Sequence, residues 1–338
     1  MPVPGWRRVL SVTLWLAVAA LLLWVVISVP LPDIWRALNH LTAWQIALLL
    51  IANTTVFFVF SMRWWVLLRV LGHRVPFGRL VLHRLAGFGM SYFTPGPQVG
   101  GEPVQLLLLH QQHAIPVAAG AASIGVDRLL EVIVNLTMLV LGLVITLRGQ
   151  MLAGVNGPGM LVPVSLLLSL PAMYVALLWT GRTPLLTQLG RLPNRIQAIP
   201  QIRRLQAVAG AVEQQAAALF RHRPGVVLFA LAASLVAWAG MLAEYGLMLL
   251  FLGVKVTPVQ LISIMTFARI AFLLPAPGAL GTLEAGQILI FEALGLDPVQ
   301  GLSASLLIRG RDVLFGLVGL WWVSLHGRKR SVNEQYDG

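Results

Sequence analysis

A short stretch rich in proline and glycine interrupts an otherwise apolar segment at residues 93–103. It contains three prolines, three glycines and the carboxylate of Glu102, a combination that no continuous buried helix tolerates. A similar stretch at residues 274–284 ends in Glu284, and its Pro275 and Pro277 repeat the spacing of the first proline pair. Each stretch therefore predicts a break between two short helices.

The composition indicates that these breaks lie in a membrane. Of the 338 residues, 58% are hydrophobic and 11% are charged, which is too apolar for a soluble domain of this size. We therefore expect an all-α integral membrane protein. The net charge of +12 does not indicate a nucleic-acid partner, because the arginines lie at the ends of apolar spans and no basic module appears. The cytoplasmic preference of cationic loops explains this charge.

Six apolar runs approach or exceed the roughly 20 residues that cross a bilayer, namely 9–29, 45–71, 116–147, 161–179, 226–252 and 302–325. The segments 80–113 and 258–294 each consist of two shorter halves, so we expect two re-entrant broken-helix hairpins. A rival count, in which some hairpin halves are full spans, stays open. Basic residues that close one end of the second run, Arg63 and Arg69 among them, are interpreted as a cytoplasmic cluster. This topology predicts an inner-membrane protein with both termini in the cytoplasm.

The order span, hairpin, span occurs twice and predicts five parts. They are a first span with an interfacial segment (1–44), repeat 1 (45–147), a returning span with a basic segment (148–225), repeat 2 (226–327) and a tail (328–338). An odd number of crossings lies between the repeats, so we expect repeat 2 to be inverted. Inverted repeats with broken helices are typical of alternating-access transporters.

The last spans of the two repeats support a duplication. Arg128 and Glu131 recur as Arg309 and Asp312, at nearly the same offset that separates the two proline pairs. Positions i and i+3 lie on one face of a helix, so each pair is expected to neutralise itself within the membrane.

The breaks and the intramembrane charges are the candidate binding residues. A helix that starts inside the bilayer presents free N–H groups that suit an anion, and Gly100 and Gly101 would let a headgroup approach the backbone at the first break. Thr282 is the predicted cap of the second such helix. The glutamates at the breaks either cap helix ends and pair with arginines, or bind a cationic headgroup or a coupling proton; both interpretations stay open. The predicted lipid-binding set is Pro95, Gly100, Gly101, Glu102, Asp127, Arg128, Glu131, Arg269, Pro277, Gly278, Gly281, Glu284, Arg309 and Asp312.

Further charges lie within the apolar segments but outside that set, namely Arg84, Glu244 and Arg311. Each such charge costs roughly 2.5–3.5 kcal/mol at a helix centre, so these side chains should face protein, one another or a wet cavity. A structural ion-pair network and a transport role both stay open. We expect no catalytic residue, metal site or cofactor, because no nucleotide loop, histidine-rich metal set or Ser-His-Asp arrangement occurs.

These motifs, taken in order, resemble the family of the lysylphosphatidylglycerol synthase transmembrane region, also called flippase-like domain proteins. The resemblance would cover nearly the whole chain, and its matching residues are Pro95, Gly100, Gly101, Glu102, Arg128, Glu131, Pro277, Gly278, Gly281 and Glu284. It implies a protein that moves a phospholipid or a polyprenyl- or hopanoid-type lipid between leaflets of the inner membrane. Bifunctional members add a soluble aminoacyl-transferase domain. After Leu325 this chain has only a short polar tail, so we expect no such synthesis.

Two classes of function remain open. The first is a lipid translocase whose partners are membrane lipids. The second is an intramembrane lipid-modifying enzyme, with Asp127 and Glu131 as its carboxylates, or a scaffold that binds a lipid-biosynthesis enzyme. The oligomeric state is not predicted.

Overall fold

The structure, a computed structural model, describes residues 41–94, 100–148, 217–274 and 279–326, with isolated positions between 32 and 39, 162 and 180, and 206 and 215. The described part is helical and contains no strand. Its continuous ranges form α3 (Ala43–Val70), α4 (Phe77–Phe93), α5 (Glu102–His113), α6 (Val117–Arg148), α11 (Pro224–Phe251), α12 (Pro258–Leu273), α13 (Thr282–Ala293) and α14 (Pro298–His326). The predicted run 9–29 lies outside the described residues, and so do most positions of the run 161–179.

Two short helices lie between two long ones in each half of the described chain, as the sequence predicts. Helices α3, α6 and α11 are long and apolar enough to cross a membrane. Helix α14 has 29 residues, which is ample length for a span, but Arg309, Arg311 and Asp312 lie near its middle. The four remaining helices have 12 to 17 residues and are shorter than a bilayer is thick. They lie where the sequence predicts the hairpin halves.

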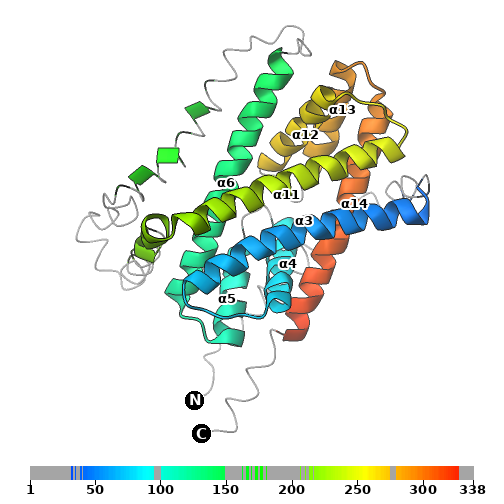
Figure 1. Cartoon of the computed structure of the whole chain (residues 1–338). Helices are drawn as coiled ribbons and strands as arrows, with labels where there is room; N and C mark the ends of the chain where they lie inside the picture. The colour runs from blue at the N-terminus through cyan, green and yellow to red at the C-terminus, as the bar shows by residue number, and fades with distance from the viewer. Residues whose placement is uncertain are drawn as a thin grey trace, which may run out of the picture.

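The helices form two units with the same order of elements, a first unit (α3–α6) and a second unit (α11–α14). Figure 1 shows that α3 and α11 lie side by side and run in opposite directions, and that α6 and α14 also run in opposite directions. Each unit's first short helix packs against the other unit's last helix, α4 against α14 and α12 against α6. Each unit therefore packs against the last helix of the other.

Glycines bring α4 and α14 into backbone contact. A Cβ atom on Gly319 would overlap the carbonyl oxygen of Leu85, and one on Gly89 would overlap that of Gly316. Small residues of this kind let membrane helices approach closely, since packing rather than hydrophobicity holds them together in lipid. A larger side chain at either position would push the two units apart.

Helices α3 and α11 contact each other at reciprocal positions. The guanidinium of Arg63 donates to the Ser234 hydroxyl at 2.7 Å, and the Asn53 amide donates to the Glu244 carboxylate at 3.2 Å. Position 63 corresponds to position 244, and position 53 to position 234, by the same offset that relates position 128 to position 309. The contact between these helices therefore has the same offset along the chain as the Arg-x-x-acid motifs of the last helices.

The first break ends at Gly101, directly before α5. The N–H of Gly101 donates to the Ser91 hydroxyl at 2.8 Å, and a Cβ atom on Gly101 would overlap the carbonyl oxygen of Gly87. The expectation that Gly101 leaves its backbone open to a headgroup is therefore wrong, because α4 covers it. Gly100, at φ +141°, makes the turn, and Pro103 lies in the first turn of α5, where its missing N–H costs no hydrogen bond.

The second break ends at Gly281, which has φ +78° and is the N-cap of α13. The predicted capping by Thr282 is wrong. Thr282 is the first residue of the helix rather than its N-cap, and its hydroxyl donates to the carbonyl oxygens of Ala271 and Ala279, each at 3.1 Å, while the Glu284 carboxylate accepts the Gly281 N–H at 2.9 Å. Pro95, Pro277 and Gly278 lie outside the described residues.

Candidate functional site

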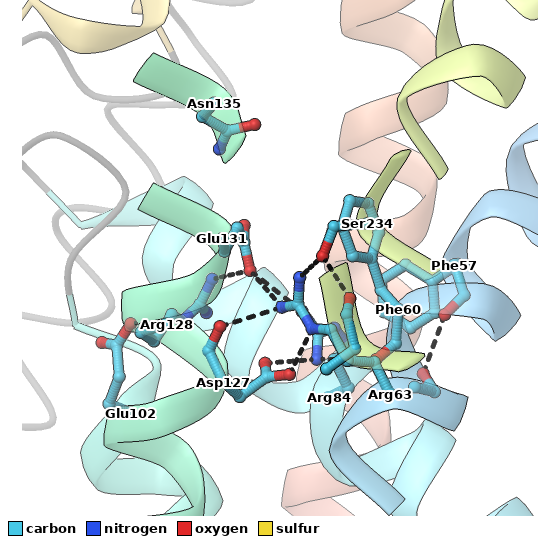
Figure 2. Close-up of polar contacts among 12 residues, drawn as sticks. Phe57, Phe60, Arg63, Arg84, Glu102, Asp127, Arg128, Glu131, Asn135 and Ser234 are labelled. Carbon is cyan, nitrogen blue, oxygen red and sulfur yellow. Dashed lines mark hydrogen bonds and ion pairs between the residues drawn. The ribbon is translucent and has the colours of Figure 1, made fainter. Parts of the chain in front are cut away.

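A buried arginine joins the first unit to α11. The Arg63 side chain is completely buried, and its Nε donates to Oδ1 of Asp127 at 2.7 Å. Its Nη2 lies 3.2 Å from Glu131, while its Nη1 donates to Ser234. Figure 2 shows this guanidinium between α6 and α11, with its donors directed at both carboxylates. The assignment of Arg63 to a cytoplasmic basic cluster is therefore wrong, since its charge is neutralised inside the protein.

Arg84 on α4 completes this cluster. It donates to Oδ2 of Asp127 at 2.9 Å and to Glu131 at 3.1 Å. Both oxygens of Asp127 are thus bound by guanidinium groups. Buried charges are retained only when they are paired and hydrogen-bonded, and removing one partner of such a pair typically costs about 3–5 kcal/mol. The arrangement around Asp127 is therefore a closed structural cluster.

Arg128 connects this cluster to the first break. Its Nε lies 2.9 Å from Glu102, and its Nη1 lies 3.2 Å from Glu131, so the predicted pair between positions 128 and 131 is present. The other oxygen of Glu102 accepts the Gly100 N–H at 3.1 Å. The glutamate therefore caps the broken helix and ties it to α6 at the same time.

The second unit repeats this tie. Glu284 accepts from Nε of Arg309 at 2.7 Å and from the Gly281 N–H. The guanidinium of Arg309 also donates to the carbonyl oxygen of Ala279 at 3.3 Å. In both units a glutamate at the break thus binds an arginine of the unit's last helix, at nearly the same separation along the chain. We call each such pair a break clamp.

The predicted pair of Arg309 and Asp312 is not present in the structure. Asp312 pairs with Arg311, whose Nη2 lies 2.8 Å away, and Arg311 also bonds Glu244. Arg311 thereby bridges two carboxylates, while Arg309 turns toward the break. The i, i+3 spacing could not reveal this, because the carboxylate of Glu244 comes from another helix.

Arg269 on α12 differs from the other intramembrane arginines. Its guanidinium donates to the sulfur of Met241 and lies 5.3 Å from the centre of the Trp238 ring. Among the described residues, no carboxylate lies within 4.0 Å of it. The Trp238 indole is itself fixed, since it donates to Asn135 on α6 at 2.7 Å.

A cavity of about 190 Å³ lies between the two units. Residues of α3, α4, α6, α11, α12 and α14 line it. The charged groups on its wall are Arg84, Arg128 and Glu131 from the first unit and Glu244, Arg269, Arg311 and Asp312 from the second. This space can hold several water molecules and is large enough for a small polar headgroup.

The structure divides the predicted binding residues that it describes into two groups. Arg128, Glu131, Arg269 and Asp312 line the cavity. The others belong to the closed cluster or to the breaks, namely Asp127, Gly100, Gly101, Glu102, Gly281, Glu284 and Arg309. Among the residues missing from the predicted set, Arg63 carries the clearest signal. It lies seven residues before the end of α3, roughly 10 Å inside the helix at 1.5 Å per residue.

Comparisons with known proteins agree with these observations. The family described as the lysylphosphatidylglycerol synthase TM region matches residues 10–319. A "UPF0104 membrane protein" of Methanothermobacter thermautotrophicus is 25% identical over 308 residues, which cover 87% of this chain and 86% of that protein. No solved structure matches the chain. With apolar helices long enough to span a bilayer and a family match over most of its length, the chain is an integral membrane protein of the lysylphosphatidylglycerol synthase transmembrane-region family.

Proposed function

We propose that this protein is a lipid transporter that moves a phospholipid or a related lipid between the leaflets of the inner membrane. The observation that carries the proposal is the charge-lined cavity between the two units. A polar headgroup crosses hydrocarbon only at a high free-energy cost. A cavity that can hold water and has charged walls lowers that cost. The headgroup would pass through the cavity while the acyl chains remain in the surrounding lipid.

An inverted repeat would make this cavity accessible from each side in turn. Three features support it, namely the opposite directions of α3 and α11 in Figure 1, the reciprocal α3–α11 contacts, and the break clamp in each unit. Transporters of this architecture hold one site near the midplane and rock one repeat against the other. In this topology both chain termini lie in the cytoplasm.

A lipid-modifying enzyme is the weaker alternative. Catalysis by Asp127 would need a carboxylate oxygen that can reach a substrate, and both of its oxygens accept from arginines. Glu131 is bound by Arg63, Arg84 and Arg128. This argues for carboxylates that stabilise the structure rather than transfer protons.

Reconstitution into liposomes tests the proposal. Purified protein is placed in vesicles that contain acyl-labelled fluorescent lipids, and the label in the outer leaflet is quenched with dithionite. We expect exchange between leaflets with wild-type protein and its loss in Arg128→Ala, whose side chain lines the cavity. Arg69→Ala, an exposed arginine on α3, is the matched control and should retain exchange. Absence of exchange together with a chemically altered lipid in mass spectra would establish the enzyme instead.

A further inference from the structure

The second unit places two cations and two anions on the cavity wall, but one of the cations pairs with both anions. Arg269 and Arg311 face Glu244 and Asp312 on this wall. Arg311 bonds both carboxylates, so these three groups together carry one net negative charge. Arg269, which within the described part of the chain contacts the Trp238 ring and the Met241 sulfur but no carboxylate, carries one net positive charge. The second unit's part of the wall is therefore neutral but has a cationic and an anionic part. The first unit's charges also balance once the partners of its wall residues, Arg63, Asp127 and Glu102, are counted.

Each part has an unused hydrogen-bonding group. A guanidinium offers five N–H donors in a fixed fork that matches a phosphate, and one N–H of Arg269 is directed at Met241. Asp312 is 7% exposed, and both of its bonds from Arg311 go to Oδ1. Within the described residues, Oδ2 of Asp312 has no hydrogen-bond donor. The cavity thus holds a free phosphate donor and a free ammonium acceptor.

We infer that the cavity takes the headgroup of a net-neutral phospholipid, with its phosphate on Arg269 and a primary ammonium on Asp312. The inference rests on the proposed transport for its lipid occupant. A zwitterion matches both parts of the wall and keeps the total charge at zero. An anionic headgroup would leave a net negative charge within the bilayer, at a cost of the same order as an unpaired residue there, and so would bind more weakly by a factor on the order of ten or more.

Binding of short-chain lipids tests the inference without requiring transport. Protein in neutral detergent is mixed with dihexanoyl phosphatidylethanolamine, phosphatidylglycerol or phosphatidylcholine, and the shift of the unfolding temperature gives the apparent affinity. We expect the ethanolamine lipid to bind about tenfold more tightly than the glycerol lipid. Choline carries no N–H for Asp312 and should fall between them. Glycerophosphoethanolamine, which lacks acyl chains, separates a lipid ligand from a soluble one and should give no shift.

Charge variants give the sharper result. Asp312→Asn removes one negative charge, so the preference should reverse in favour of the anionic glycerol lipid. Arg269→Gln should abolish the response to the ethanolamine lipid, Arg269→Lys should restore part of it, and Arg69→Gln should leave it unchanged. Arg269 has no carboxylate partner among the described residues, so its removal orphans no buried acid and the variant should fold.

The outcomes separate this inference from the proposed function. Equal binding of the two phospholipids, with no change in Asp312→Asn or Arg269→Gln, would overturn the zwitterion site even if the vesicles exchange lipids. Selective binding without leaflet exchange would support the site and overturn transport. A response to glycerophosphoethanolamine as large as that to the lipid would assign the site to a soluble ligand and overturn the lipid assignment.

Discussion

The two units place opposite charges at the matching position of their first helix. Residue 63 in α3 is an arginine, and the corresponding residue 244 in α11 is a glutamate. In the first unit Arg63 binds Asp127 and Glu131 directly. In the second unit Glu244 and Asp312 are both acidic, and Arg311 lies between them. The first unit thus has a closed cluster, whereas the cluster of the second unit keeps an open carboxylate oxygen.

The break clamps differ in burial. The Arg128 side chain is 30% exposed and lines the cavity, whereas that of Arg309 is 1% exposed and does not reach the cavity wall. Arg311 occupies the wall in the second unit instead. We interpret the clamp as the part that both units keep, because it fixes the break. The cavity wall is the part in which they differ, with structural pairing in the first unit and binding in the second.

The largest effect is expected from breaking the closed cluster. Asp127→Asn leaves Arg63 and Arg84 short of one carboxylate charge in a buried site, which should lower the free energy of unfolding by about 3–5 kcal/mol. Asp312→Asn, which removes a carboxylate charge from the second unit's cluster, should cost much less, because Arg311 keeps Glu244. Thermal unfolding in detergent compares the two. Equal losses would refute the contrast between a closed and an open cluster.

A second test addresses the contact between the units. Gly319→Val places a side chain against the backbone of Leu85, and overpacking of this kind typically costs about 1–3 kcal/mol. Gly225→Val on α11, where an added Cβ atom would meet nothing within 4 Å, is the control and should be close to neutral. The same thermal assay decides, and an unchanged unfolding temperature in Gly319→Val would mean that α4 and α14 do not touch.

The smallest expected effect separates the two clamps. Glu284→Gln removes the charge opposite the fully buried Arg309, while Glu102→Gln leaves Arg128 with Glu131 as a partner. We expect Glu284→Gln to be the more destabilising by about 1 kcal/mol, since a charged donor left with a weaker buried partner costs more than an exposed one. Urea unfolding at fixed detergent concentration measures the difference. The reverse order would contradict the assignment of the more buried clamp to the second unit.

Helix boundaries could be predicted well because proline and glycine mark them directly. Pro258 begins α12 and Pro103 lies in the first turn of α5, so both predicted starts are within one residue of the structure. The i, i+3 pair of Arg128 and Glu131 was also accessible, since helix geometry alone fixes it.

Contacts between helices could not be predicted in the same way. Nothing in the sequence ties Glu102 to Arg128 on a later helix, and the match between positions 63 and 244 is hidden because their charges are opposite. Positions 53 and 234 likewise hold different residues, asparagine and serine. The reciprocal packing of α3 and α11 becomes visible only once the helices are placed.

Accessibility of the cavity tests the central claim most directly. The chain has no cysteine, so Ala268→Cys places a single small thiol on the cavity wall. A membrane-impermeant thiol reagent is added to either side of oriented vesicles, with Leu235→Cys on the exposed apolar face of α11 as the lipid-facing control. We predict that the thiol at position 268 reacts from both sides and the one at position 235 from neither. Reaction at position 268 from one side only, or from neither, would contradict a single cavity that serves both leaflets.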